Sequence, residues 1–153
     1  MNYQQQAIAG MNPVELIVAL YDGMVRFLYR AIEAIEAGNV RERRIAIKRT
    51  LDILMHLQSR LRMDVGGSSA KSLSEFYAAI FALCLEGSRL ASPERLKEAI
   101  ACVRDVREAW SIVSKDPEVI RFLAKAQGKQ AVRGTAPPPP VPVSEEAASS
   151  WMA

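Results

Sequence analysis

Apolar residues recur every three or four positions through most of this chain, the spacing that places side chains on one face of an α-helix. Polar residues, glycines and prolines divide this pattern into four segments. We expect helices over residues 13–37, 40–63, 70–90 and 93–114. Each would be roughly 20 to 25 residues long, which is within the range of helices in globular proteins.

Capping residues support these boundaries. Asn12 and Ser92 can each accept a hydrogen bond from the first turn, and each is followed by a proline whose φ suits the first helical position. Glu15 can complete a capping box with Asn12. Gly38 is suited to ending the first helix. Residues 64–69, with two glycines, are predicted to form a loop between the second and third helices.

Short connections between helices force neighbours to run antiparallel. The sequence therefore predicts an all-α fold, an antiparallel up-down four-helix bundle. Asp116 and Pro117 indicate a short extra C-terminal helix, to about residue 126. We divide the chain into an N-terminal arm (1–12), a helical bundle domain (13–127) and a Pro-rich tail (128–153) that we expect to be disordered.

Two helices carry more apolar residues than one buried face requires. The main stripe of the third helix is Leu73, Phe76, Ile80, Leu83, Gly87 and Leu90. The main stripe of the fourth helix is Leu96, Ala99, Val103, Val106, Trp110 and Val113. The third helix also carries a second stripe, Tyr77, Phe81 and Leu85, and the second helix carries a comparable set, Ile53 and Leu57. Such a stripe either fills a wide contact between helices or lines an open groove. Periodicity leaves both interpretations open.

Composition narrows the class of protein. The chain has 153 residues, of which half are hydrophobic, and a formal net charge of +3, with a basic cluster at Arg41, Arg43, Arg44, Lys48 and Arg49. This cluster could bind phosphates, but a solvated helix face is the simpler interpretation. The sequence has no apolar run long enough to span a membrane and no signal peptide, and Cys84 and Cys102 resemble core thiols of a reducing compartment. We expect a cytoplasmic protein.

Residues with the spacing of catalytic or metal sites are missing. His56 is the single histidine, and we expect it to be a partly exposed helix residue rather than a metal ligand. Gly66 and Gly67 do not form a phosphate loop with Lys71, because the spacing differs from that of GxxxxGK[ST]. The sequence therefore argues against an enzyme, and it indicates no catalytic residue, metal or cofactor.

Four motifs, in order, resemble those of the flagellar secretion chaperone family FliS. The first is a tyrosine followed five positions later by an aliphatic residue and then by a capped helix start, and the second is a Leu-Tyr-Asp-Gly run. The third is a glycine loop with the helix start after it, and the fourth is an Arg-Glu-x-Trp helix end. The matching residues are Tyr3, Ile8, Asn12-Pro13 and Leu20-Tyr21-Asp22-Gly23; Gly66-Gly67, Ala70-Lys71-Ser72-Leu73 and Phe76-Tyr77; and Val106-Arg107-Glu108-Ala109-Trp110. The resemblance covers about residues 3–114; Asn12 departs from the family's serine cap, and the tail has no counterpart.

The resemblance implies an export chaperone that binds the disordered C-terminal region of flagellin in the cytosol. Such a protein prevents premature polymerisation and aids delivery to the flagellar type III export apparatus. Other flagellar assembly or export proteins are possible partners, and nucleic acid is not expected. The alternative is a basic helical regulator that binds RNA or another flagellar assembly factor.

The expected partner-binding residues come from the arm and from the second stripes. They are Tyr3, Ile8, Ile53, Leu57, Tyr77, Phe81 and Leu85. We interpret the arm as a cover that competes with flagellin, although a frayed terminus is the plainer alternative. Tyr21, Asp22 and Gly23 are interpreted as structural residues, and Trp110 as a core residue. Trp151 and Met152 would either visit the flagellin groove or belong to a passive tail.

Overall fold

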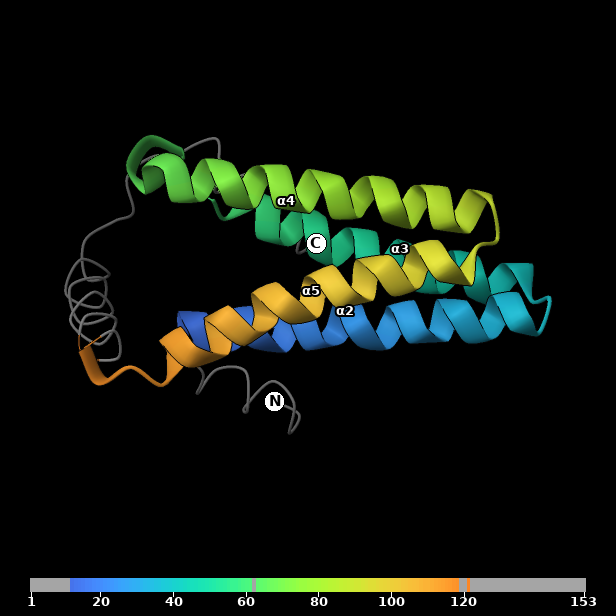
Figure 1. Cartoon of the computed structure of the whole chain (residues 1–153), viewed down its shortest axis with the longest axis horizontal. Helices are drawn as coiled ribbons and strands as arrows, with labels where there is room; N and C mark the ends of the chain where they lie inside the picture. Colours follow the sequence, from blue (N-terminus) through green and yellow to red (C-terminus); the bar gives the residue numbers. More distant parts are fainter. Residues whose placement is uncertain (1–11, 62, 119–120, 122–153) are drawn as a thin grey trace, which may run out of the picture.

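The computed structural model describes residues 12–61, 63–118 and 121, and its regular structure there is helical throughout. Four helices follow one another along the chain: α2 (Pro13–Glu36), α3 (Val40–Ser59), α4 (Met63–Arg89) and α5 (Pro93–Ser114). Each runs antiparallel to the next, as Figure 1 shows. The predicted all-α up-down bundle is therefore confirmed. Residues 1–11 of the predicted arm and residues 122–153, which include the predicted tail, lie outside the described residues.

The four helices pack in a ring of neighbours. Helix α2 lies against α3 and α5, and α4 lies against the same two helices from the opposite corner. In Figure 1, α4 diverges from α5 and α2 toward the end of the bundle where α2 begins. That end is where the start of α2, the end of α3, the start of α4 and the end of α5 meet.

The predicted capping residues set the starts of α2 and α5. The Glu15 backbone N–H donates to Asn12 Oδ1 over 2.8 Å, and the Asn12 N–H donates to Glu15 Oε2 over 3.3 Å, which completes the capping box. The Ser92 hydroxyl accepts from the Arg95 N–H over 3.3 Å. These bonds satisfy N–H groups that the first turn of a helix leaves without a partner. The predicted range of the last helix, 93–114, is confirmed.

The prediction between the second and third helices is wrong. Helix α3 ends at Ser59, four residues early, and most of the predicted loop at 64–69 belongs to α4. The chain bends instead at Gly67, whose φ of 56° and ψ of −136° interrupt the helix. Glycine adopts this conformation without the steric cost that a Cβ would add. The glycines that indicated a loop therefore mark a break inside a helix.

The buried face of α4 is rotated from the predicted main stripe. Tyr77, Ile80 and Cys84 are buried, whereas Leu83 is half-buried and Leu90 is 50% exposed. Gly87, a member of the predicted stripe, is also buried, and a Cβ built on it would lie only 2.6 Å from Leu96 Cδ2 on α5. The tyrosine of the second stripe therefore belongs to the core.

The expectation for His56 is also wrong. Its side chain is buried, with 5% exposure, rather than partly exposed. The Nε2 atom lies 3.4 Å from Arg60 Nη1. Burial, and then the charge of Arg60, lower the pKa of His56 below its ordinary value, so the neutral imidazole is favoured in the folded protein.

Candidate functional site

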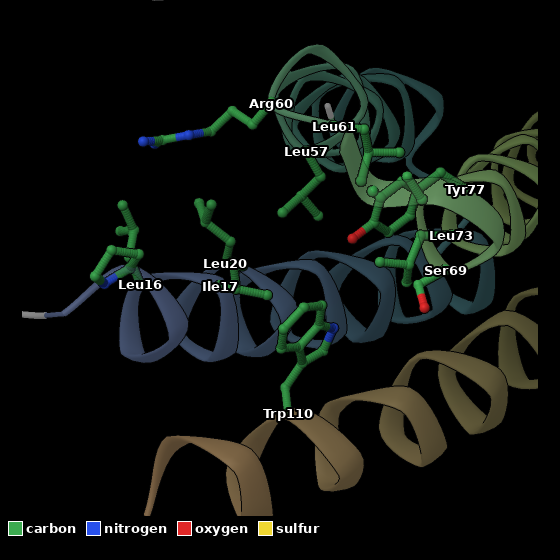
Figure 2. A pocket seen from close by; sticks show the side chains of 13 residues that line it. Leu16, Ile17, Leu20, Leu57, Arg60, Leu61, Ser69, Leu73, Tyr77 and Trp110 are labelled. Carbon is green, nitrogen blue, oxygen red and sulfur yellow. The ribbon is translucent and has the colours of Figure 1, made fainter. Parts of the chain in front are cut away.

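A mostly apolar pocket of about 390 Å³ opens at the end of the bundle where α2 begins. We call it the end pocket. All four helix ends contribute to its wall, as Figure 2 shows for the labelled side chains. The lining residues are Pro13, Leu16, Ile17, Leu20, Leu57, Arg60, Leu61, Gly66, Ser69, Ala70, Leu73, Tyr77 and Trp110.

The pocket exists because large and small residues face each other across this end. The first turns of α2 present Leu16, Ile17 and Leu20, all of them only half-buried. The facing start of α4 offers Gly66, a serine and an alanine, which are too small to fill the space between the helices. Apolar side chains thus remain accessible at a place where a filled core would enclose them.

A hydrogen-bonded triad contributes Tyr77 and Trp110 to the wall, and its third member is the buried Tyr21. Tyr21 Oη and Tyr77 Oη lie 2.8 Å apart, and Trp110 Nε1 donates to Tyr21 Oη over 3.3 Å. The three residues come from α2, α4 and α5, so the triad ties together three helices at the base of the pocket. The two tyrosine rings also pack edge to face, with centroids 6.2 Å apart.

The Tyr21 hydroxyl is the shared member of the triad. Tyr21 is fully buried, and among the described residues its oxygen lies near only Trp110 and Tyr77 as polar partners. The indole N–H can only donate, so Tyr21 accepts from Trp110, whereas either tyrosine can donate in the hydrogen bond between the two hydroxyls. Burial raises the pKa of both tyrosines, so both hydroxyls stay protonated.

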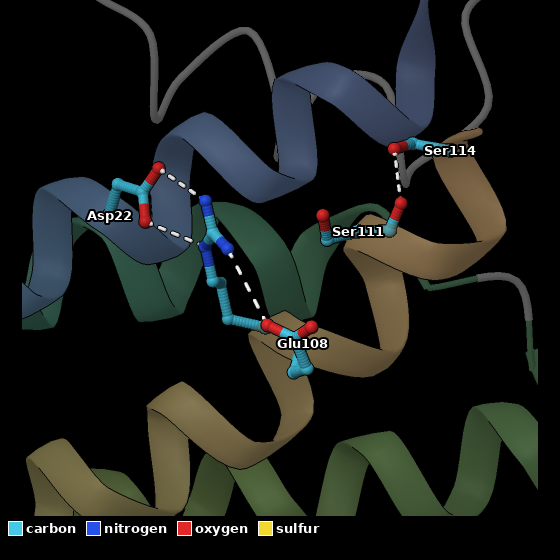
Figure 3. Close-up of polar contacts among 5 residues, drawn as sticks. Asp22, Glu108, Ser111 and Ser114 are labelled. Atoms are coloured by element: carbon cyan, nitrogen blue, oxygen red, sulfur yellow. Dashed lines mark hydrogen bonds and ion pairs between the residues drawn. The ribbon is translucent and has the colours of Figure 1, made fainter.

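An ion pair next to the triad fixes α5 against α2. Arg107 Nε donates to Asp22 Oδ1 over 2.9 Å, and Arg107 Nη2 donates to Oδ2 over 3.4 Å; Figure 3 shows this fork and the weaker contact to Glu108 at 3.8 Å. The hydrogen bond with Asp22 raises the pKa of the Arg107 guanidinium. Asp22 therefore joins two helices, which agrees with its interpretation as a structural residue.

Gly23 has the structural role that we expected. It is buried, and a Cβ at this position would lie 3.3 Å from Ile53 Cδ1 on α3. This approach of α2 and α3 is tight, but the contact atom is the end of the Ile53 side chain; a glycine within a helix costs about 1 kcal/mol relative to alanine. The same contact places Ile53 at the α2–α3 crossing.

The expected partner-binding residues do not share one surface. Leu57 and Tyr77 line the end pocket, and both are buried. Phe81 is half-buried against the core, whereas Leu85 is 47% exposed on α4. The second stripe therefore runs from the pocket wall onto the open surface. Tyr3 and Ile8 lie outside the described residues.

Sequence reasoning missed most of the pocket wall. Leu16, Ile17 and Leu20 are not among the residues expected to bind a partner, and Trp110 was interpreted as a core residue. The one available signal was the run of small residues at 66–70, placed at the same end of the bundle as the start of the first helix. Periodicity within a single helix cannot show which faces of four helix ends remain uncovered.

Most of the basic cluster lies on one exposed face of α3. Arg41, Arg44 and Lys48 are exposed and three or four positions apart, whereas Arg43 is half-buried. Arg49 lines a shallow depression between α2 and α3 that also contains Glu33 and Glu42. Carboxylates beside the basic residues weaken the attraction for phosphates.

Among the described residues, no helix is both long and apolar enough to cross a membrane.

Comparison with known proteins identifies the family of this chain. The family described as "Flagellar protein FliS" matches residues 1–117. The flagellar secretion chaperone FliS of Campylobacter jejuni is 31% identical over 117 residues, which cover 76% of this chain and 91% of that protein. The FliS chaperones of Vibrio cholerae (25% identical; 79% and 88% covered) and Salmonella typhimurium (27%; 72% and 82%) are also similar. The chain therefore belongs to the FliS family of flagellar secretion chaperones.

Proposed function

We propose that this protein is a cytosolic export chaperone that binds the disordered C-terminal region of flagellin. In this role it prevents premature polymerisation and aids delivery of the subunit to the flagellar type III export apparatus. The observation that carries the proposal is the end pocket, an accessible apolar cavity in a member of a secretion chaperone family. A disordered client that folds on its chaperone needs such surfaces, because apolar burial must offset its ordering cost.

Two apolar surfaces are available to flagellin. The first is the end pocket, which Leu57 and Tyr77 share with the start of α2. The second is the exposed part of the second stripe, at Phe81 and Leu85. Each fully buried side chain of this size contributes about 2 kcal/mol. Several such contacts are needed, which favours a client that spans both surfaces.

The N-terminal arm belongs to the same proposal. Its two isolated apolar residues, Tyr3 and Ile8, precede the start of α2, and Pro13 lines the end pocket. We infer that the arm covers part of the flagellin surface on α3 and α4 until flagellin arrives. Deletion of residues 2–10 then raises the affinity for flagellin, whereas an unchanged affinity in calorimetry rules out this competition.

Co-purification with flagellin tests the function directly. The full chain is expected to retain flagellin whose C-terminal segment is intact and to release flagellin that lacks this segment. Retention of both forms would place the contact elsewhere on flagellin. Retention of neither would argue against flagellin as the client.

Surface variants test the two apolar surfaces. Leu16→Asp at the rim of the pocket and Leu85→Asp on α4 each remove an accessible apolar contact, and each is expected to weaken flagellin binding at least about tenfold, the effect of 1.4 kcal/mol. Ile112→Asp is the control, because Ile112 is 66% exposed on α5 and outside the pocket wall. Equal losses in all three variants would show that neither surface is specific.

The alternative function, a regulator that binds RNA or another flagellar assembly factor, has less support. Arg41, Arg44 and Lys48 share one exposed face of α3, but they form a short cluster, and Arg49 lies beside carboxylates. Recognition of nucleic acid favours a continuous basic stripe that neutralises several phosphates. No observation on the described surface favours RNA over an apolar protein segment.

A further inference from the structure

We propose that the segment around Trp151 and Met152 docks into the end pocket of its own chain. Its docked side chains occupy the space between Leu16, Leu73 and Trp110. The proposal deepens the proposed function, because a docked tail competes with flagellin for the pocket. This regulatory consequence rests on the proposed function. The family match ends at residue 117, so the tail is a feature that this chain adds to the matched region.

The chain leaves the bundle beside the pocket. Trp110 lines the pocket and stands four residues before the end of α5 at Ser114. At a rise of 1.5 Å per residue, this places the helix end about 6 Å farther along the axis. In Figure 1, α5 ends at the same end of the bundle at which α2 begins. The end of α5 therefore lies within a short distance of the cavity.

The length of the tail suits this return. About 30 residues separate Arg121 from Trp151, and a flexible chain of that length spans about 30 Å on average. The prolines at 137–140 favour a more extended path, which still allows the last residues to fold back. A tether of this kind gives an effective concentration on the order of 1 mM, so even a contact with a dissociation constant of about 0.1 mM would be mostly formed.

The chemistry of the segment matches the pocket. Tryptophan and methionine stand next to each other, and together they offer a large flat ring and an adaptable apolar chain. The wall is apolar apart from a few groups, which come from Arg60, Ser69 and Tyr77.

Charge distinguishes the tail from the N-terminal arm as the occupant. Arg60 is exposed at the rim of the pocket, where Figure 2 shows its side chain on the same side as that of Leu16. The tail carries Glu145 and Glu146 shortly before Trp151, within about 20 Å of extended chain. The arm, residues 1–12, has no charged side chain. Attraction between Arg60 and these carboxylates therefore favours the tail.

Nuclear magnetic resonance of the full chain tests the docking. The chain has two tryptophans, so a ¹⁵N-labelled sample gives two indole N–H signals, and Trp151→Phe assigns them. We expect the Trp151 signal to differ from that of a synthetic peptide of residues 141–153. We also expect about tenfold slower hydrogen exchange for its indole, in keeping with the estimated docked fraction.

Pocket variants decide where the indole lies. Leu16→Arg is expected to move the Trp151 signal to its position in the free peptide, whereas Ile112→Arg, outside the pocket, is expected to leave it unchanged. A Trp151 signal at the free position in the unmodified chain, or one that ignores Leu16→Arg, would overturn the proposal. So would docking that appears only after deletion of residues 2–10, or that depends on protein concentration. The measurement contains no flagellin, so its failure would leave the chaperone function standing.

Discussion

The hydroxyl of Tyr21 is the polar centre of the candidate site. It accepts from Trp110 and shares a hydrogen bond with Tyr77, so one atom of α2 connects α4 and α5 behind an apolar pocket. Buried polar groups that lose a partner are costly, whereas fully satisfied ones favour a single arrangement of the helices. We therefore assign Tyr21 a double role, in stability and in orienting the Tyr77 hydroxyl.

Tyr21→Phe is expected to lower the free energy of unfolding by about 2 kcal/mol, because it leaves the Tyr77 hydroxyl and the Trp110 indole without their shared partner. Urea unfolding of the full chain, followed by circular dichroism, measures this change. Tyr29→Phe is the matched control, since Tyr29 is 40% exposed on the same helix and should change stability by less than about 0.5 kcal/mol. Equal effects of the two substitutions would contradict the assigned role of the triad.

His56 gives the protein a pH-dependent stability. Its folded pKa lies below the ordinary value of 6.5, because burial and the charge of Arg60 disfavour the imidazolium. The unfolded chain therefore binds a proton more readily than the folded one just below that pH. By linkage, the contribution of His56 is fully present above pH 6.5 and decreases as the pH falls toward the folded pKa.

A comparison of melting temperatures at pH 7.5 and pH 5.5 tests this contribution. The unmodified chain is expected to lose more stability on acidification than His56→Gln, which cannot take up a proton at this position. Because carboxylates titrate in both proteins, the difference between the two proteins isolates the histidine. If both lose the same stability, burial of the imidazole does not affect its proton affinity.

At the scale of the helix, the local capping residues predicted the helix starts correctly, whereas the apolar pattern did not predict the rotation of α4. Asn12 and Ser92 set helix starts through bonds to their own first turns, which neighbouring sequence alone encodes. The rotation of α4 depends on contacts with α5, and two apolar stripes of similar strength left it undecided. Contacts between residues of two different helices leave no signal in the apolar spacing of either helix.

Gly87→Ala is expected to destabilise the protein by about 1 to 3 kcal/mol. The added Cβ would lie 2.6 Å from Cδ2 and 3.0 Å from Cγ of Leu96, which is fully buried and has little room to move. Differential scanning calorimetry of the full chain measures the effect as a lowered melting temperature.

Gly23→Ala is the matched control, because it adds the same methyl group where α2 contacts α3. Its new Cβ meets only Ile53 Cδ1 at 3.3 Å and an arginine side chain at 3.8 Å, and Ile53 is half-buried and can shift by a few tenths of an ångström. The gain in helix propensity, up to about 1 kcal/mol, should then offset the contact. A larger loss at position 23 than at position 87 would reverse the order that these distances imply.

At the scale of the whole molecule, the candidate site arises from the meeting of four helix ends. The sequence indicated the bundle and two members of the pocket wall, Leu57 and Tyr77, but not the cavity itself. Its volume depends on the divergence of α4 and on small residues near Gly67 that face the start of α2. These are relations between segments some 50 residues apart, and they have no signature in the pattern of either segment.

The response of binding to salt separates the two candidate functions of the whole molecule. Flagellin that binds through apolar surfaces should lose less than about tenfold in affinity between 50 and 200 mM salt, and its binding should show a negative heat-capacity change. A nucleic acid held by six or more phosphate contacts would lose about a thousandfold or more over the same range. Isothermal titration calorimetry at several temperatures and two salt concentrations measures both quantities, with a flagellin C-terminal segment and a single-stranded RNA as ligands. Tight, steeply salt-dependent binding of RNA together with weak flagellin binding would favour the regulator, because then the basic residues of α3, and not the end pocket, would determine what the bundle recognises.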